Sequence, residues 1–407
     1  MAPPSLAFFA MPQLGHFQCL RPLIREISRR GARAHVFTDR RFRDAVERAG
    51  GEFVDIFGAY PIESADRDSL PTPCRFVAFA AVFAGPVTEE LARRGVDLVV
   101  YDTHAVIGRV AARRLAVPYV NVCAGHNLDP ARSLRELRTD PLVSVSDACR
   151  RAVEVLRDRE GLEDASPFAY VSGISPFLNV YNEPTQFLAE DERTPFEPIA
   201  FSSSLVPPDG AEQRPGRAPT LFPGGRSALR VYVSFGTIIW KYWRERALEA
   251  LHTIADGLAR TPRASGLLSL GGVLPATAAR QLRRPNVAAA AQVDQWRALA
   301  EADAFITHHG INSTHEAIFN LTPMISYPFF ADQPGLARRC QEFGLAQPLS
   351  DGVRGQISEE SVALAVAELE DRRESLGARL SEAREWEREA IARQGEVAER
   401  VLDLIPG

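Results

Sequence analysis

Short apolar runs alternate with stretches of helical periodicity along this sequence, and this alternation limits its fold more than any other feature. In the first part of the chain the apolar runs are residues 6–10, 34–38 and 98–102, and residues 20–30 and 107–115 have the spacing of amphipathic helices. Strands joined through helices at this spacing pair in parallel by right-handed crossovers. We therefore predict an α/β protein whose parallel sheets carry helices on their faces.

A second series of the same kind begins at residue 229. Its apolar runs are residues 231–234, 267–270, 304–307 and 324–327. The segment before it is dense in proline and glycine and has no periodicity, which is typical of an interdomain linker. A chain of 407 residues is also too long for one ordinary core. We predict two Rossmann-like domains at 1–205 and 229–385, a linker at 206–228 and a terminal helix at 386–407.

Composition argues against several classes of protein. The hydrophobic share is 45% and the charged share is 24%, as in globular proteins with large cores. The net charge is −5 and the arginines are scattered among acidic residues, so we expect no nucleic-acid binding. The five cysteines are widely spaced and form no Cys-x-x-Cys pair. They indicate buried thiols in a reducing cytoplasm, and neither a disulfide framework nor a zinc site.

The sequence predicts no membrane segment. Its first ten residues lack the basic region of a signal peptide. The longest uncharged apolar stretch, residues 76–87, is too short for a membrane span, and we predict a helix of the core or of a pocket wall. We expect a cytoplasmic protein that is a monomer or a homodimer.

The segment from residue 303 to residue 333 predicts an anion site. The apolar run 304–307 ends in a turn at His308 and Gly310, and the small polar residues Asn312 and Ser313 precede a helical run. The first N–H groups of a helix have no internal partner and lie at the positive end of its dipole. A phosphate placed there gains hydrogen bonds and a favourable field.

Acceptor groups follow these donors. Glu316 lies one helical turn beyond Asn312 on the same face, and an ionised carboxylate accepts hydrogen bonds. Asp332 and Gln333 follow the next predicted strand, at the edge of the sheet where ligands bind. Donors followed by acceptors suit a phosphate that is joined to sugar hydroxyls.

These residues carry a resemblance to a known family. The pattern His-x-Gly-x-Asn-Ser-x-x-Glu, then Thr-Pro, a strand and Asp-Gln, preceded by residues 293–295, resembles the donor-binding signature of family 1 nucleotide-sugar glycosyltransferases. That family has the GT-B fold, in which two Rossmann-like domains with parallel sheets face a central cleft. Its N-terminal domain binds the acceptor, its C-terminal domain binds the nucleotide sugar, and the terminal helix packs back on the N-terminal domain.

The resemblance implies a set of donor-binding residues. In this sequence they are Ser234, Thr237, Val293, Gln295, His308, Gly310, Asn312, Ser313, Thr314, Glu316, Asp332 and Gln333. Two positions depart from the pattern. His309 replaces the first glycine of the family's His-Gly-Gly turn, so it is either a ligand or a tolerated turn residue. Gln292 stands where plant members have a tryptophan that stacks on uracil, so the base must be recognised elsewhere.

The catalytic residues implied by the resemblance lie in the N-terminal domain. Gly15-His16 opens a helix after the first predicted strand, and a histidine there can act as general base towards an acceptor hydroxyl. Asp102 ends another strand and would orient His16 and stabilise its protonated form. The alternatives are a helix-start histidine and a helix-capping aspartate. His104 competes less strongly for a catalytic role.

The sequence implies no metal. An Asp-x-Asp triplet occurs at residues 66–68, but it lacks a preceding apolar strand and is typical of a polar loop. The phosphate charge would instead be met by the helix N-terminus, His308 and Ser313, with Thr237 as a further donor. The nucleotide sugar is then a cosubstrate, and we expect no cofactor.

We therefore expect an inverting transferase that uses single displacement. His16 takes the acceptor proton, the nucleophile attacks C1 of a sugar held by Asp332 and Gln333, and the diphosphate leaves. Glu316 favours a UDP-sugar as donor because a ribose offers it two hydroxyls and a 2′-deoxyribose offers one, and glucose is the default sugar because Asp332 and Gln333 can hold its hydroxyls. By the resemblance, many bacterial relatives that use dTDP-deoxysugars lack this glutamate. The acceptor is expected to be a natural-product aglycone.

Other functions stay open from the sequence. Within the same family the alternative is an antibiotic glycosyltransferase that uses a dTDP-deoxysugar. A sugar-nucleotide epimerase and a non-catalytic partner of the same fold are the further alternatives. The aromatic cluster at residues 240–243 either stacks on a flat acceptor or packs in the ordinary way.

Overall fold

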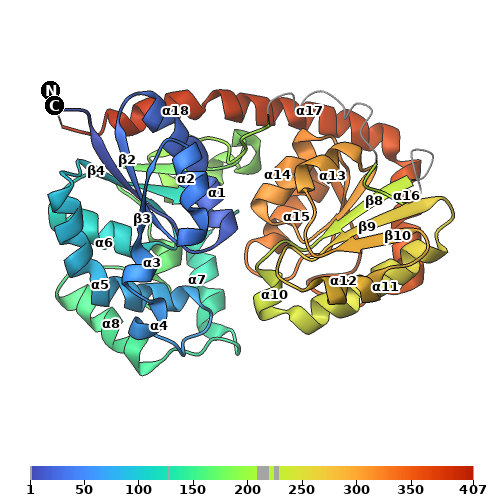
Figure 1. Cartoon of the computed structure of the whole chain (residues 1–407), viewed down its shortest axis with the longest axis horizontal. Helices are drawn as coiled ribbons and strands as arrows, with labels where there is room; N and C mark the ends of the chain where they lie inside the picture. Colours follow the sequence, from blue (N-terminus) through green and yellow to red (C-terminus); the bar gives the residue numbers. More distant parts are fainter. Residues whose placement is uncertain (1, 127–128, 209–219, 224–228, 407) are drawn as a thin grey trace. The chain divides into compact units, whose positions relative to one another are not determined.

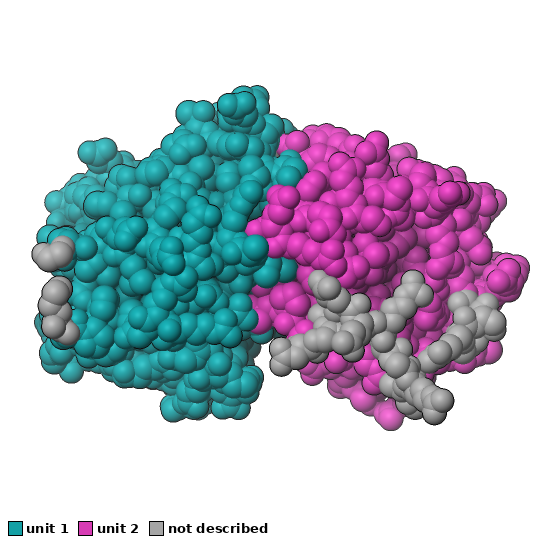
Figure 2. Space-filling model, turned by 90° about the horizontal axis from the view of Figure 1, so that it is seen from above, with its two compact units in different colours: residues 1–204, 390–407 teal, residues 205–389 magenta. Residues whose placement is uncertain are grey.

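The computed structural model describes residues 2–126, 129–208, 220–223 and 229–406. The chain divides into two compact units, coloured separately in Figure 2. Unit 1 comprises Met1–Ser204 with Ala390–Gly407, and unit 2 comprises Leu205–Glu389. Most of the predicted linker, residues 209–219 and 224–228, lies outside the described residues. The predicted roles of the two domains in binding stay predictions.

Unit 1 is built on a seven-stranded parallel sheet with the order β3-β2-β1-β4-β5-β6-β7 (Figure 1). Strands β1, β4, β5 and β6 are buried throughout, as expected of a parallel sheet that is covered on both faces, whereas the edge strands β3 and β7 are only partly buried. The strands are β1 (Ser5–Phe9), β2 (Arg33–Thr38), β3 (Glu52–Asp55), β4 (Leu98–Asp102), β5 (Tyr119–Cys123), β6 (Leu178–Tyr181) and β7 (Ile199–Phe201).

The helices of unit 1 bury the apolar faces that their periodicity predicts. The uncharged apolar stretch lies within α5, which contributes Phe76, Val77, Phe79 and Ala80 to the core and packs against α6 and α8. The helices are α1 (Leu14–Arg29), α2 (Arg43–Arg48), α3 (Ile56–Ala59), α4 (Ile62–Ala65), α5 (Pro73–Arg93), α6 (Val106–Leu115), α7 (Pro130–Thr139), α8 (Asp147–Asp158), α9 (Ala169–Ser172) and α18 (Gln394–Leu402).

The last helix of the chain, α18, belongs to unit 1. It packs against α1, where Arg30 donates to the Gly395 carbonyl at 2.9 Å. Arg25 of α1 also donates to the side chain of Gln394 at 3.0 Å. Helix α17 (Arg373–Ala392) precedes it and begins in unit 2.

Unit 2 repeats the architecture with six parallel strands in the order β10-β9-β8-β11-β12-β13 (Figure 1). The strands are β8 (Leu229–Ser234), β9 (Ala264–Ser269), β10 (Val287–Ala290), β11 (Ala304–Thr307), β12 (Met324–Ser326) and β13 (Ala346–Pro348). The helices are α10 (Ile239–Tyr242), α11 (Arg244–Arg260), α12 (Ala276–Leu282), α13 (Gln295–Glu301), α14 (Ile311–Phe319), α15 (Gln333–Glu342) and α16 (Glu359–Asp371). The predicted α/β class with two parallel sheets is therefore confirmed.

Each sheet has a point at which the strand order reverses. In unit 1 this point lies between β1 and β4, and in unit 2 it lies between β8 and β11. Connections leave such a point in opposite directions, so a crevice opens outside the carboxyl ends of the two strands, and ligands bind there. The segments that follow β1 and β4, and those that follow β8 and β11, therefore border the two crevices.

The five cysteines are free thiols, and all of them are buried. Burial raises the pKa of Cys74 and Cys123 to about 12. Among the residues that the structure describes, no helix has the length and apolar character needed to cross a lipid bilayer.

Candidate active site

His16 and Asp102 meet at the reversal point of unit 1. Strands β1 and β4 are neighbours in register, with Phe9 opposite Tyr101, so the segments that follow them start side by side. His16 lies in the first turn of α1, and its Nδ1 atom is 2.9 Å from Oδ1 of Asp102. The aspartate side chain is fully buried, whereas that of His16 is 13% exposed. The structure thus brings together the two predicted catalytic residues.

The carboxylate of Asp102 is fixed by its own neighbourhood. The Met11 N–H donates to Oδ2 at 2.7 Å, and the His104 N–H donates to Oδ1 at 2.8 Å. Burial by itself raises the pKa of Asp102, but His16, His104 and the Met11 N–H outweigh it and hold this pKa below the ordinary value. An ionised Asp102 accepts the proton on Nδ1 of His16, which leaves Nε2 as the basic atom of that ring.

His104 is a third member of this group, although from the sequence it competes less strongly than Asp102 for a catalytic role. Its ring centroid lies 4.4 Å from that of His16, at an interplanar angle of 41°. The edge of Tyr170 packs against its other side, with 5.1 Å between the centroids. Burial, and next the nearby His16, lower the pKa of His104 to about 3, although Asp102 acts in the opposite direction. His104 is therefore neutral at physiological pH.

In unit 2 the segment after β11 forms the predicted turn into a helix. Gly310 is the N-cap of α14, and among the described residues no side chain caps this helix end. The first turn of the helix is formed by Ile311, Asn312 and Ser313, whose N–H groups lie before the first intrahelical hydrogen bonds. Together with the helix dipole they form a site suited to a phosphate.

His308 joins this turn to the segment after β8. A Cβ atom added at Gly236 would lie 2.7 Å from Nε2 of His308, and one added at Gly310 would lie 2.6 Å from the same atom. The imidazole therefore occupies space that only two glycines leave open. Gly236 also has a φ of 65°, which favours glycine for a second reason. Burial lowers the pKa of His308 to about 4, against a smaller effect of the Ser234 backbone, so the ring is neutral and has one N–H to donate.

Gln295, a predicted donor-binding residue, connects two others. It starts α13, and its Nε2 atom donates to Oγ of Ser313 at 3.0 Å and to Oε2 of Glu316 at 2.7 Å. Ser313 and Glu316 lie on one face of α14, so the amide holds the hydroxyl and the carboxylate in a fixed relation. Val293, two residues before Gln295, is half-buried.

His309 supports the turn from inside. It is fully buried with a φ of 60°. Its Nε2 atom lies 2.8 Å from Oγ of Ser326, and its Nδ1 atom lies 3.2 Å from Oγ1 of Thr314. Burial and the nearby His308 lower the pKa of His309 to about 3. The structure thus gives His309 a packing role, and it also directs the Thr314 hydroxyl inward, away from the exposed part of the first turn.

The remaining predicted donor residues lie in the segments after β8 and β12. Ser234 ends β8 and is buried, and Thr237 is exposed in the following turn. Asp332 is the half-buried N-cap of α15. Gln333 is buried, and its Oε1 atom accepts hydrogen bonds from the N–H groups of Phe329 at 2.9 Å and Phe330 at 3.3 Å.

The aromatic residues that follow the β8 turn pack within unit 2. Trp240 is a core residue, and its Nε1 atom donates to the Gly236 carbonyl at 2.9 Å. Trp243 lies under the Arg354 guanidinium, which is 3.7 Å from the ring centroid. These contacts favour ordinary packing for the aromatic cluster.

The acidic side chain of the predicted polar loop at residues 66–68 is held by hydrogen bonds from neighbouring groups. Asp66 is buried, and its Oδ1 atom accepts from the N–H groups of Asp68 and Ser69 and from the Ser146 hydroxyl. Among the described residues, no cluster of three or more histidines, cysteines or acids is arranged to hold a metal ion.

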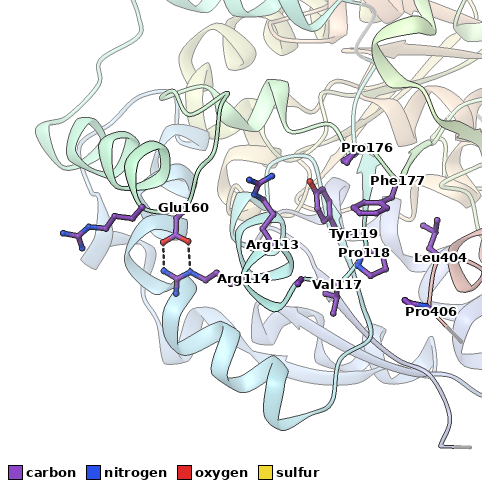
Figure 3. A pocket seen from close by; sticks show the side chains of 12 residues that line it. Arg113, Arg114, Val117, Pro118, Tyr119, Glu160, Pro176, Phe177, Leu404 and Pro406 are labelled. Atoms are coloured by element: carbon purple, nitrogen blue, oxygen red, sulfur yellow. Dashed lines mark hydrogen bonds and ion pairs between the residues drawn. The ribbon is translucent and has the colours of Figure 1, made fainter.

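A groove of about 780 Å³ lies on unit 1 away from His16 and Asp102 (Figure 3). Val117, Pro118 and Tyr119 line it at the start of β5, which is the opposite edge of the sheet. The rings of Tyr119 and Phe177 lie beside one another there, and Glu160 pairs with Arg114 on one wall. This groove is separate from the carboxyl edge, where the candidate residues gather.

The chain is similar to known glycosyltransferases. Residues 224–372 match the family model described as "UDP-glucoronosyl and UDP-glucosyl transferase". The chain is 24% identical over 409 residues to the zeaxanthin glucosyltransferase of Pseudescherichia vulneris, with 93% of each chain covered.

Two solved structures show the same fold. The glycotransferase of kitacinnamycin superposes with a TM-score of 0.75 at 20% identity, covering 99% of both chains. The spinosyn rhamnosyltransferase complexed with thymidine diphosphate superposes with a TM-score of 0.66 at 18% identity, covering 97% of this chain and 99% of the other. Both similarities extend over the two units, and they confirm the predicted GT-B fold.

Proposed function

We propose that this chain, a family 1 glycosyltransferase with the GT-B fold, moves a sugar from a nucleoside diphosphate to a hydroxyl of a small natural product, with inversion at the sugar carbon. The observation that carries the proposal is the hydrogen bond of 2.9 Å between His16 and the buried Asp102. It supplies a general base at the reversal point of unit 1, in a chain whose unit 2 carries a phosphate-type helix start.

The proposed base reaction follows from the geometry of the pair. Asp102 holds the proton of His16 on Nδ1, so Nε2 can accept the proton of an acceptor hydroxyl as that oxygen attacks C1 of the sugar. The imidazolium that forms is stabilised by a carboxylate that is already buried and fixed by two N–H donors. Asp102 acts through His16 and does not itself take up the proton.

The proposed departure of the diphosphate depends on unit 2. Charge builds up on the leaving phosphate as the bond to the sugar breaks. The N–H groups at the start of α14, the Ser313 hydroxyl and the neutral imidazole of His308 are donors suited to this charge. Because these donors are held by the fold, they need little reorganisation during the reaction. Asp332 and Gln333 are proposed to bind the hydroxyls of the sugar.

Attack on the face opposite the leaving diphosphate inverts the sugar carbon. An α-linked donor therefore gives a β-linked product. We propose no metal ion in this reaction, because backbone and imidazole donors meet the phosphate charge.

For the donor we propose a UDP-sugar, with UDP-glucose as the first choice. Gln295 holds the Glu316 carboxylate beside Ser313 on the exposed side of the α14 start. A carboxylate held there can accept from both hydroxyls of a ribose. A dTDP-deoxysugar is the second candidate, because the spinosyn rhamnosyltransferase, a structural neighbour, was solved with thymidine diphosphate.

A transfer assay tests the proposal. The purified chain is incubated with UDP-glucose or dTDP-glucose and a panel of hydroxylated natural products, and mass spectrometry detects the addition of one hexosyl unit. We expect transfer by the wild type and a β linkage by proton NMR of the product. His16→Ala is the matched control and should leave the acceptors unmodified. Retention of the α configuration in the product would contradict the proposed mechanism.

A further inference from the structure

His104 and His16 are tied to one oxygen atom of the buried carboxylate. Oδ1 of Asp102 accepts from Nδ1 of His16 at 2.9 Å and from the backbone N–H of His104 at 2.8 Å. The two imidazoles then pack against each other, with 4.4 Å between their centroids. The two rings therefore lie side by side at the buried carboxylate.

The two ring nitrogens of His104 differ in their surroundings. The Nδ1 atom of His104 is buried, and none of the described residues forms a hydrogen bond with it. The Nε2 atom of the same ring is not in this situation. A proton on Nδ1 would be a buried donor without an acceptor, which costs free energy. The proton of this neutral ring therefore belongs on Nε2, where water or a ligand can accept it.

Both rings thus turn an inner nitrogen towards the protein and have a second nitrogen on the outer side. The outer nitrogen of His16 accepts a proton, and that of His104 donates a hydrogen bond. We propose that His104 binds the acceptor through Nε2–H, at an oxygen that flanks the hydroxyl attacked by the sugar. The substrate class is then a hydroxyl next to a carbonyl, an ether or a second hydroxyl, as in catechols and hydroxyquinones. This inference rests on the proposed function.

The charge states of the two rings support His104 as a hydrogen-bond donor and His16 as the base. Burial lowers the pKa of His104 to about 3, so its ring stays neutral while His16 becomes an imidazolium. The groups that face His104 are Asp102, His16 and the edge of Tyr170. A second cation in this group would oppose proton uptake by His16. A neutral donor can orient the acceptor without that penalty.

The first test addresses the imidazole itself and needs no acceptor. Long-range ¹⁵N NMR of the histidine side chains, with His104→Gln used for assignment, reports which nitrogen carries the proton. We expect the neutral Nε2–H form of His104 between pH 5 and pH 8. A neutral Nδ1–H form, or an imidazolium, would overturn the proposal whatever reaction the protein catalyses.

The second test compares matched acceptors. Each pair consists of two acceptors with the same skeleton, one with and one without an oxygen atom next to the reacting hydroxyl, for example 2-methoxyphenol and 2-ethylphenol. The skeletons are phenol, naphthol, flavone and anthraquinone. The wild type should favour the flanked member in kcat/KM by about threefold to tenfold, the worth of one neutral hydrogen bond. The preference should appear as a lower KM for the flanked acceptor, because the hydrogen bond from His104 is present in the ground state as well as in the transition state.

Two substitutions separate this hydrogen bond from packing. His104→Phe keeps an aromatic ring between His16 and Tyr170 but has no N–H, and it should abolish the preference. His104→Gln keeps an N–H donor and should retain part of it. An unchanged preference in His104→Phe, or none in the wild type, would overturn the inference. Absence of transfer from any sugar nucleotide to any acceptor would instead contradict the proposed function, and the NMR test would still decide the state of His104.

Discussion

The imidazole of His308 occupies the space that a side chain at Gly236 would need, because a Cβ atom there would lie 2.7 Å from its Nε2 atom. This contact joins the turn after β8 to the turn after β11, so the two segments at the reversal point of unit 2 cannot change independently. The same imidazole lies 2.6 Å from the place of a Cβ atom at Gly310, the N-cap of α14, so it borders the start of that helix as well.

Gly236→Ala should destabilise unit 2 and weaken nucleotide binding together. The new methyl group meets the buried His308 ring, and a φ of 65° strains an L-residue by about 1–2 kcal/mol. We expect a loss of about 2–4 kcal/mol in the free energy of unfolding, measured in urea. Gly377→Ala is the control, because nothing lies within 4 Å of a Cβ at this helical position. It should stabilise by up to about 1 kcal/mol. Equal effects of the two substitutions would contradict this account of His308.

His16→Ala should lower kcat by about two to four powers of ten while donor affinity stays within twofold, as expected when a general base is removed. Asp102→Asn should act in the same direction but less, because the imidazole remains while its orientation and the stabilisation of its charge are lost. Initial rates and isothermal titration with the nucleotide measure the two quantities. High residual turnover in His16→Ala would assign the base role to another group.

His309→Gly should destabilise the chain, although it restores the turn of the family pattern. The substitution relieves a φ of 60°, worth about 1–2 kcal/mol, but it removes a fully buried ring and its bonds to Ser326 and Thr314. Loss of a buried side chain of this size costs about 2–5 kcal/mol, so the net effect should be a loss of about 1–3 kcal/mol. Urea unfolding monitored by circular dichroism measures it. A neutral or stabilising outcome would favour a merely tolerated turn residue.

Acid should weaken the fold between pH 6.5 and pH 4. The pKa of His308 is lowered to about 4 and that of His309 to about 3, whereas the unfolded values lie near 6.5. In this window the unfolded chain binds more protons than the folded one, so stability falls as the pH falls. His309→Gln removes one such group and should flatten the slope by about 1.4 kcal/mol per pH unit between pH 4 and pH 6. An unchanged slope would mean that His309 is protonated in the fold.

UDP should raise the melting temperature more than dTDP at equal concentration. Glu316 can accept from both ribose hydroxyls, and a 2′-deoxyribose leaves it one partner short at a cost of about 1–3 kcal/mol. Glu316→Ala should reduce the difference in melting temperature between the UDP and dTDP samples. Glu301→Ala is the control and should leave this difference unchanged, because the Glu301 carboxylate on α13 accepts from Thr220 and Leu221 instead. Differential scanning fluorimetry gives the comparison. Equal or stronger stabilisation by dTDP would favour a dTDP-deoxysugar donor.

The parts of this molecule that follow from local sequence could be predicted. The strands before His16 and before His308 are short apolar runs that end in glycine-containing turns, and both features act over a few residues. Parallel pairing follows from the spacing of the strands. The meeting of His16 with Asp102 required the order of the strands as well, which the resemblance supplied and spacing alone did not.

Contacts between distant segments could not be predicted in the same way. His309 owes its buried position to Ser326 on the neighbouring strand, which no local pattern reveals. The hydrogen bond from Trp240 to Gly236 likewise decides that this ring packs inward. For His104, the decisive fact is that its Nδ1 atom has no hydrogen-bond partner within the described part of the chain, and this depends on every residue that surrounds the ring.

The buried thiols allow local unfolding of each unit to be measured by alkylation. Cys340 is the cysteine of unit 2, and the other four lie in unit 1. Burial raises the pKa of Cys149 to about 11, so this thiol, like Cys74 and Cys123, stays unreactive while its surroundings are folded. The rate at which an alkylating reagent modifies Cys340, followed by peptide mass, therefore records the opening of unit 2 by itself, without a label or a substitution.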